Sequence, residues 1–134
     1  MIFNPRSQLL QTFKSNKQRL FDYELIKDQT TGLRTVAFGK FAGMAGMVDI
    51  LQGYGQRLLS DGFSTPFLNS PMCYMSEDLE MAKKKVADLG SAISSGQMPA
   101  KAGHIVFCFT GGMGNVSAGA QSVFACMPNH KFIR

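Results

Sequence analysis

The chain has 134 residues, enough for one modest domain with a hydrophobic core. Hydrophobic residues make up 45% of it, charged residues make up 17%, and the mean hydropathy is −0.02, which excludes a disordered chain. The formal net charge is +5, but the basic residues are scattered and the single run, Lys83–Lys85, is not interleaved with aromatic residues, so we expect no nucleic-acid partner.

The cysteines and the apolar stretches exclude further classes of protein. Cys73, Cys108 and Cys126 are odd in number and widely spaced, and the two histidines lack ligand spacing, so the sequence predicts no metal site. This cysteine usage is typical of a reducing compartment. The first residues show no signal-peptide pattern, and the most apolar stretch, 36–51, carries two charges and is too short to span a bilayer. We therefore expect a soluble protein with no membrane partner.

The first half of the chain predicts a helix, a hairpin and a second helix. Residues 7–18 read as a short helix, and 19–26 and 33–39 read as strands joined by a turn. Apolar residues at helical spacing then predict a helix over 40–59. Each interior glycine of that helix costs up to about 1 kcal/mol relative to alanine, which suggests close approach of a helix, a sheet or a ligand. These glycines are Gly43, Gly46, Gly53 and Gly55.

A loop over 61–71 separates this helix from an amphipathic one. Ser76 is the predicted N-cap, with acidic residues following in the first turn, where the helix dipole favours them. Apolar residues spaced by three and four continue the helix to about Ser95, and Gly96 is its predicted stop.

Residues 104–134 resemble a dinucleotide-binding βαβ unit in size and order. The apolar run 104–109 is typical of a strand buried on both faces of a parallel sheet. A glycine-rich turn follows at 110–115, then a helix from Val116 to about Cys126, then a short strand at 130–134.

The glycine turn predicts a phosphate site. Gly112 and Gly114 permit a tight turn and let the backbone approach a pyrophosphate, which the N–H groups at the helix start would bind. Gly119 lets the helix lie near the strand. Arg134 suits a 2′-phosphate, or is an ordinary exposed arginine. The alternative is a glycine-rich loop that binds nothing. The candidate cofactor-binding residues are Gly112, Gly114, Asn115, Val116, Ser117 and Gly119.

Two parallel strands do not form an independent domain, because their edges stay unpaired. The preceding hundred or so residues supply helices and a hairpin but no third parallel strand. We therefore expect the chain to be a segment of a larger enzyme or to depend on a partner.

Several sequence blocks occur in a fixed order and indicate a family. They are FDYELI, RTVAFGKFAGMAGMVDIL, GQRLL, STPF, MPAKAG and VFCFTGGMGNVSAGAQ. Together they closely resemble the lysine–2-oxoglutarate reductase (saccharopine-forming) part of α-aminoadipic semialdehyde synthases, in the alanine dehydrogenase and transhydrogenase-like superfamily. The resemblance runs from about Asn4 to Ile133.

The resemblance implies an α/β fold with two lobes, of which this chain is an internal fragment. Residues 1–39 would end the substrate lobe, 40–60 would form the glycine-rich helix between the lobes, and 61–134 would begin the Rossmann lobe. The implied partners are the remainder of the same polypeptide and, in a homo-oligomer, further copies.

The resemblance also implies an oxidoreductase of lysine catabolism, an NADP-dependent saccharopine dehydrogenase of the lysine-forming type. Its reaction condenses lysine with 2-oxoglutarate, and hydride from NADPH gives saccharopine. The implied location is the mitochondrial matrix; without the resemblance, the sequence predicts only a soluble cytoplasmic protein.

By motif, the resemblance places Glu24, Arg34 and Phe38 in the substrate cleft. Arg34 would hold a substrate carboxylate, and Glu24 would tune the proton affinity of its neighbours. The alternative is an ordinary cross-strand ion pair. The family's acid–base lysine and histidine lie upstream of this chain, so we assign no catalytic residue and expect the fragment alone to be inactive. Two turns, the glycine turn and the one before Arg34, are each one residue longer than in the family.

Two other functions stay open at this point. One is a non-catalytic, truncated module that binds nucleotide or pairs with a partner through the helix carrying Gly43–Gly55. The other is a different pyridine-nucleotide amino-acid dehydrogenase. The sequence does not separate NADPH from NADH.

Overall fold

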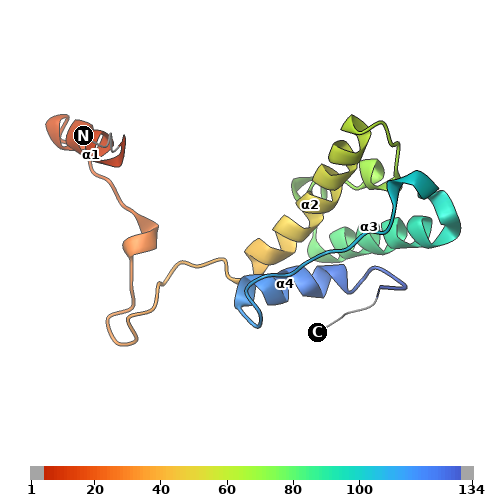
Figure 1. Cartoon of the computed structure of the whole chain (residues 1–134). Helices are drawn as coiled ribbons and strands as arrows, with labels where there is room; N and C mark the ends of the chain where they lie inside the picture. Colours follow the sequence, from red (N-terminus) through yellow and green to blue (C-terminus); the bar gives the residue numbers. More distant parts are fainter. Residues whose placement is uncertain (1–4, 131–134) are drawn as a thin grey trace. The chain divides into compact units, whose positions relative to one another are not determined.

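The computed structural model describes residues 5–130 of the chain. It divides into two compact units, Met1–Ala37 and Phe38–Arg134. Figure 1 shows the chain coloured along its sequence. Among the described residues, no helix combines the length and apolar character needed to cross a membrane.

The first unit contains helix α1, Pro5–Ser15, and one 3-10 turn, Tyr23–Leu25. Its loop is closed by Asp28, whose carboxylate accepts the backbone N–H groups of Thr30 and Thr31 at 3.0 and 2.7 Å. The Thr31 N–H, the Thr31 hydroxyl and the Thr30 N–H all lower the pKa of Asp28, because they bond to its charged form.

The two strands predicted for 19–26 and 33–39 do not form. The described residues there show one isolated antiparallel bridge, from Lys27 in the predicted turn to Arg34. The reason is the lack of a core in this unit: from residue 7 to 37 every residue is exposed except the half-buried Phe13. A lone hairpin with no face to pack on is marginal in water.

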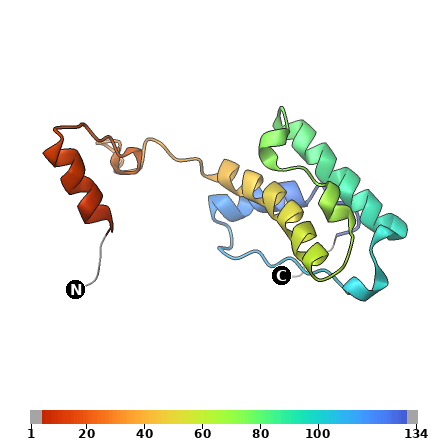
Figure 2. The ribbon, with the colours of Figure 1, turned by 90° about the horizontal axis from the view of Figure 1, so that it is seen from above.

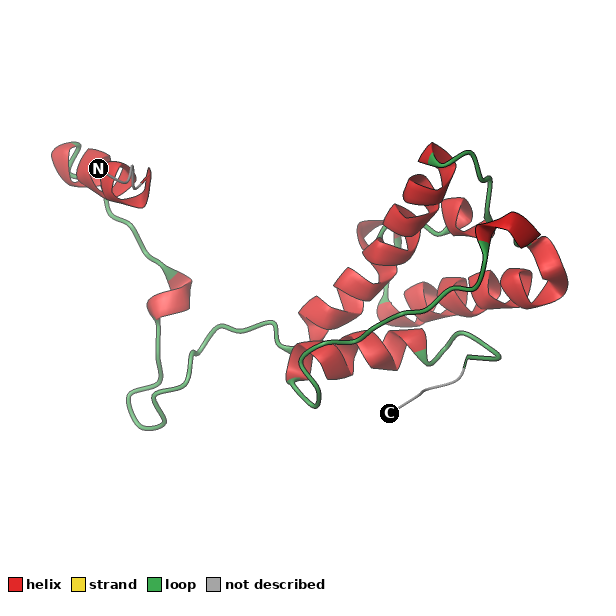
Figure 3. Cartoon of the chain, in the orientation of Figure 1, coloured by secondary structure: helices red, strands yellow, loops and turns green. Residues whose placement is uncertain are grey.

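The second unit is built from three helices, α2 (Lys40–Ser60), α3 (Leu79–Ala92) and α4 (Asn115–Phe124). Short helical turns at Pro66–Asn69, Cys73–Met75 and Ala100–Ala102 connect them, and a π-helical turn, Ile93–Gln97, continues α3. Figures 2 and 3 show this helical arrangement. The core residues are Met47, Val48, Leu51, Leu58, Phe67, Ala82, Val86, Leu89, Val123, Phe124 and Met127.

Two of the four glycines in α2 mark close backbone contacts. A Cβ at Gly43 would overlap the Val116 carbonyl of α4, and one at Gly55 would lie 2.6 Å from the Leu68 nitrogen. Gly46 and Gly53 have open space instead. The close approach predicted from the glycines is therefore confirmed at two positions, and the approaching element at Gly43 is a helix.

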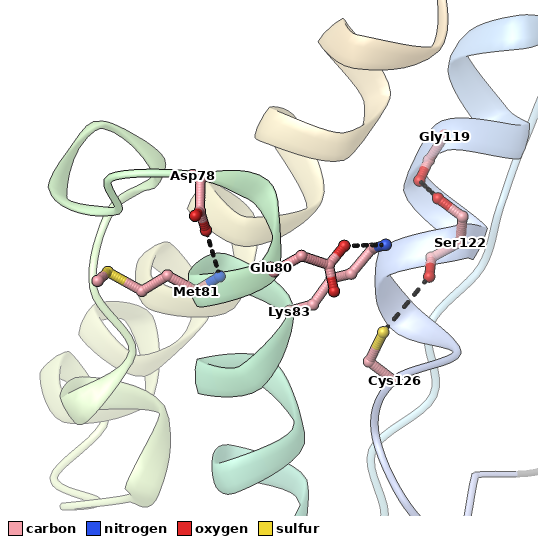
Figure 4. Close-up of polar contacts among 7 residues, drawn as sticks. All are labelled: Asp78, Glu80, Met81, Lys83, Gly119, Ser122 and Cys126. Atoms are coloured by element: carbon pink, nitrogen blue, oxygen red, sulfur yellow. Dashed lines mark hydrogen bonds and ion pairs between the residues drawn. The ribbon is translucent and has the colours of Figure 1, made fainter.

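Helix α3 begins later than predicted, and a different residue caps it. The Asp78 carboxylate accepts the Met81 N–H at 2.7 Å, as Figure 4 shows. Ser76 is not the cap: its N–H ends the preceding 3-10 turn by donating to the Cys73 carbonyl, and its buried hydroxyl has no partner among the described residues. Gly96 has a φ of 86°, which confirms the predicted stop at this residue.

Residues 104–109 are extended, and the described part of the chain assigns them to no strand. Ile105, Phe107 and Phe109 are half-buried against the core, whereas Val106 is 87% exposed and Cys108 is exposed. This alternation has the period of a strand packed on one face. In Figure 1 the segment crosses the second unit as a long extended stretch.

The described residues therefore contain four α-helices and no strand, and they do not support the predicted βαβ unit. A strand needs a neighbour to satisfy its backbone, and the backbone groups of residues 104–108 form no hydrogen bond to any described residue. The second predicted strand, 130–134, and Arg134 lie outside the described residues except for His130.

Candidate functional site

The glycine turn has a conformation that its glycines require. Gly111 and Gly112 have φ values of 87° and 54°, in the left-handed region that side chains disfavour. The Gly114 N–H donates to the Gly111 carbonyl at 3.0 Å and closes the turn. A Cβ at Gly114 would lie only 3.1 Å from that carbonyl oxygen. At Gly111, Gly112 and Gly114 the backbone of the turn is therefore not covered by a side chain of its own.

The first turn of α4 leaves its N–H groups available. Its N-cap, Gly114, has no side chain to accept a hydrogen bond, and no described residue accepts one from the N–H groups of residues 115–117. The regular helix bonding starts with the Ala118 N–H, which donates to the Gly114 carbonyl at 2.9 Å. These free donors carry the positive end of the helix dipole, the arrangement that binds phosphate in many proteins.

The predicted cofactor residues divide into an exposed set and a buried set. Gly112, Gly114, Asn115 and Val116 are exposed on the turn and the helix start. Ser117 is only 8% exposed, and its hydroxyl accepts a hydrogen bond from Gln121 within α4. Its side chain thus faces the protein, although its N–H belongs to the same helix start.

Gly119 packs against α2 rather than against residues 104–109. A Cβ there would overlap the Lys40 carbonyl. A glycine is therefore required at position 119, as predicted, but the element that approaches it is a helix and not the predicted strand.

The start of α2 adjoins the start of α4, which the sequence did not indicate. Gly39 caps α2 without a side-chain bond, and a Cβ on it would lie 3.9 Å from the Asn115 Cβ. Figures 1 and 2 both show the two helix starts side by side. Two uncapped N-termini and the exposed Lys40 therefore give this end of the unit a positive potential. Only tertiary packing reveals the pair, because the two segments are far apart in the chain.

The predicted substrate residues are brought together in part. Arg34 Nη1 and Glu24 Oε2 are 2.6 Å apart in the first unit, with side chains 45% and 59% exposed. Phe38, 64% exposed, belongs to the second unit. The described ion pair uses one guanidinium nitrogen of Arg34, which leaves the others able to bind a carboxylate.

Comparison with curated proteins finds relatives along nearly the whole chain. It is 47% identical over 125 residues, 93% of its length, to the alpha-aminoadipic semialdehyde synthase of Arabidopsis thaliana. It is 46% and 44% identical over 120 residues to the mitochondrial alpha-aminoadipic semialdehyde synthases of Mus musculus and Bos taurus. The chain spans only 12–13% of these relatives' own length. No family model matches it. The chain is a homologue of one region of the alpha-aminoadipic semialdehyde synthases, the proteins that its ordered sequence blocks resemble.

Proposed function

We propose that the chain is the nucleotide-binding region of an oxidoreductase of lysine catabolism, one that condenses lysine with 2-oxoglutarate to saccharopine using NADPH. The observation that carries this proposal is the exposed glycine turn before α4, within a chain 47% identical to a named alpha-aminoadipic semialdehyde synthase. The mitochondrial names of the mammalian relatives support a mitochondrial location.

The glycine turn fits a dinucleotide. Gly112 and Gly114 leave the backbone open, and the N–H groups of Asn115, Val116 and Ser117 would bind the pyrophosphate. Lys40 adds a positive charge beside the same helix start. Bound there, NADPH would supply the hydride for the reduction. In this proposal the backbone N–H groups of the helix start hold the phosphates, and the glycines keep the turn free of side chains.

Arg34 would hold a substrate carboxylate, and both substrates carry carboxylates. Its guanidinium is exposed enough to be reached, and Glu24 fixes one of its nitrogens. A planar fork oriented by a partner binds a carboxylate with two parallel hydrogen bonds. The acid–base groups would come from other parts of the longer protein. We therefore expect the chain alone to turn over no substrate and to bind nucleotide weakly.

In that longer protein, residues 104–109 would be a strand of a Rossmann sheet. Their extended backbone, their apolar side chains on both faces and the turn and helix that follow support this reading. The fold of the complete lobe would then be α/β, with the three helices described here covering the sheet.

The nucleotide site is tested in a chimera, the Arabidopsis thaliana relative with its homologous region replaced by this chain. We expect Gly112→Ala to weaken NADPH binding about tenfold or more, because a left-handed turn with a side chain no longer presents its backbone. The matched control is Gly62→Ala, since Gly62 also has a positive φ of 87° and open space around it.

The control variant carries a similar strain, about 1 kcal/mol, but lies far along the chain at the end of α2. It should leave NADPH affinity unchanged. If the two variants bound NADPH with equal affinity, the proposed nucleotide site would be wrong. Saturable NADPH binding by the 134-residue chain, with an inactive chimera, would instead favour the non-catalytic module.

A further inference from the structure

The start of helix α2 carries a positive charge that no described ion pair compensates. Neither α2 nor α4 has an acidic residue in its first turn, and neither has a side-chain cap at its N-terminus. Lys40, the first residue of α2, is exposed, and none of the ion pairs that the described residues form includes it. The positive ends of two helix dipoles and one ammonium group therefore adjoin, with no carboxylate in either first turn to offset them.

Backbone contacts between α2 and α4 fix the position of Lys40. A Cβ on Gly119 would overlap the Lys40 carbonyl oxygen and lie 2.9 Å from the Lys40 Cα, so residue 40 packs directly against residue 119. On the preceding residue, Gly39, a Cβ would lie 3.9 Å from the Asn115 Cβ. Residues 115 and 119 are about 6 Å apart along a helix axis, so Lys40 lies beside the first turn of α4. Its flexible four-carbon stem can carry the ammonium group to an anion at that turn.

The Lys40 ammonium group keeps its full charge for such an anion. Its Nζ lies 5.6 Å from the centroid of the Phe41 ring, and Phe41 is itself 61% exposed. An aromatic face attracts a cation but carries no net charge. The dipole at the start of α4 is equivalent to only about half an elementary charge. A pyrophosphate bound there carries more negative charge than that, so Lys40 would supply positive charge that the helix start lacks.

We propose that Lys40 is a further nucleotide-binding residue, a cation that reaches from the start of α2 to the pyrophosphate held at the start of α4. This role rests on the proposed function, since it takes the glycine turn as the nucleotide site. The contact is with the pyrophosphate and not with a 2′-phosphate, because the pyrophosphate is the part of the nucleotide that such a turn binds. Gly119 is then a positioning residue, because its missing side chain lets Lys40 lie this close to α4.

The experiment measures the dissociation constants of NADPH and of NADH for the chimera described above, by fluorescence titration at low and at high salt. Both nucleotides contain the pyrophosphate, so Lys40→Gln should raise both dissociation constants, by about three- to tenfold at low salt. High salt screens an exposed charge, so the effect of the substitution should shrink there. Lys40→Arg should restore most of the affinity, since it keeps the charge on a long side chain.

The matched control is Lys84→Gln, which removes the same charge from an exposed position on α3 and should leave both dissociation constants unchanged. Equal weakening by Lys40→Gln and Lys84→Gln would overturn the proposal, because only the net charge would then matter. A Lys40→Gln chimera that loses affinity for NADPH alone, or for neither nucleotide, would overturn it as well. The Gly112→Ala chimera tests the nucleotide site itself, so a failure of that site is distinguished from a failure of the role of Lys40.

Discussion

Gly43 and Gly46 lie one turn apart on α2, and only Gly43 contacts another backbone. Its Cα faces the Val116 carbonyl of α4, whereas Gly46 faces open space. The same residue type thus has opposite energetic roles. At Gly43 it permits two helices to touch, and at Gly46 it only adds freedom to the unfolded chain.

We expect Gly43→Ala to lower the free energy of unfolding by about 2–4 kcal/mol, because the new methyl group must push α2 away from α4. Gly46→Ala should raise it by about 0.5–1 kcal/mol, because alanine favours the helix and nothing clashes. Urea denaturation followed by circular dichroism measures both. If the two substitutions change stability alike, the described contact between α2 and α4 is wrong.

At the scale of elements, helix starts depend on which side chain reaches the free N–H groups. Asp78 caps α3, and the Ser76 hydroxyl is buried without a described partner. Asp78→Ala should therefore cost about 1 kcal/mol of stability, the usual value for a lost N-cap. Ser76→Ala should cost nothing or stabilise slightly, since it removes an unsatisfied buried hydroxyl. Thermal unfolding of the two variants compares them, and a larger loss for Ser76→Ala would contradict the assignment.

The helices were predictable because their signals are local. The spacing of apolar residues indicated α2 within a residue of its observed bounds, and Gly96 marked the end of the α3 region. The cap of α3 was not predictable as confidently, since Ser76 and Asp78 are both good N-caps two residues apart. The strand predictions were wrong for a different reason. A strand exists only with a neighbour, and residues 104–108 have the period and side chains of a strand but form no backbone hydrogen bond to a described residue.

The candidate site shows the same contrast between local and long-range information. The glycine turn could be placed from residues 110–119 alone. Its proximity to Gly39 and Lys40 could not, because it arises where Gly43 and Gly119 let two helices cross. The ion pair of Glu24 with Arg34 is the alternative that the sequence left open beside their placement in the substrate cleft, whereas the assignment of Phe38 to the other compact unit needed the structure.

At the scale of the whole molecule, the two units differ in whether they have a buried core of their own. The second has a buried core from three helices, and the first has no buried residue in its described part. The unpaired 104–108 edge and the coreless first unit both fit a chain that spans 12–13% of its relatives. Any catalytic activity is therefore expected only with the regions that the relatives add.

The most direct measurement is lysine-dependent oxidation of NADPH by the chimera that carries this chain in the Arabidopsis thaliana relative. We predict turnover that requires both lysine and 2-oxoglutarate, within about tenfold of the parent rate, and a marked rise in the KM of one substrate on Arg34→Ala. A folded chimera that oxidises NADPH only with another amino or keto acid, or not at all, would contradict the account.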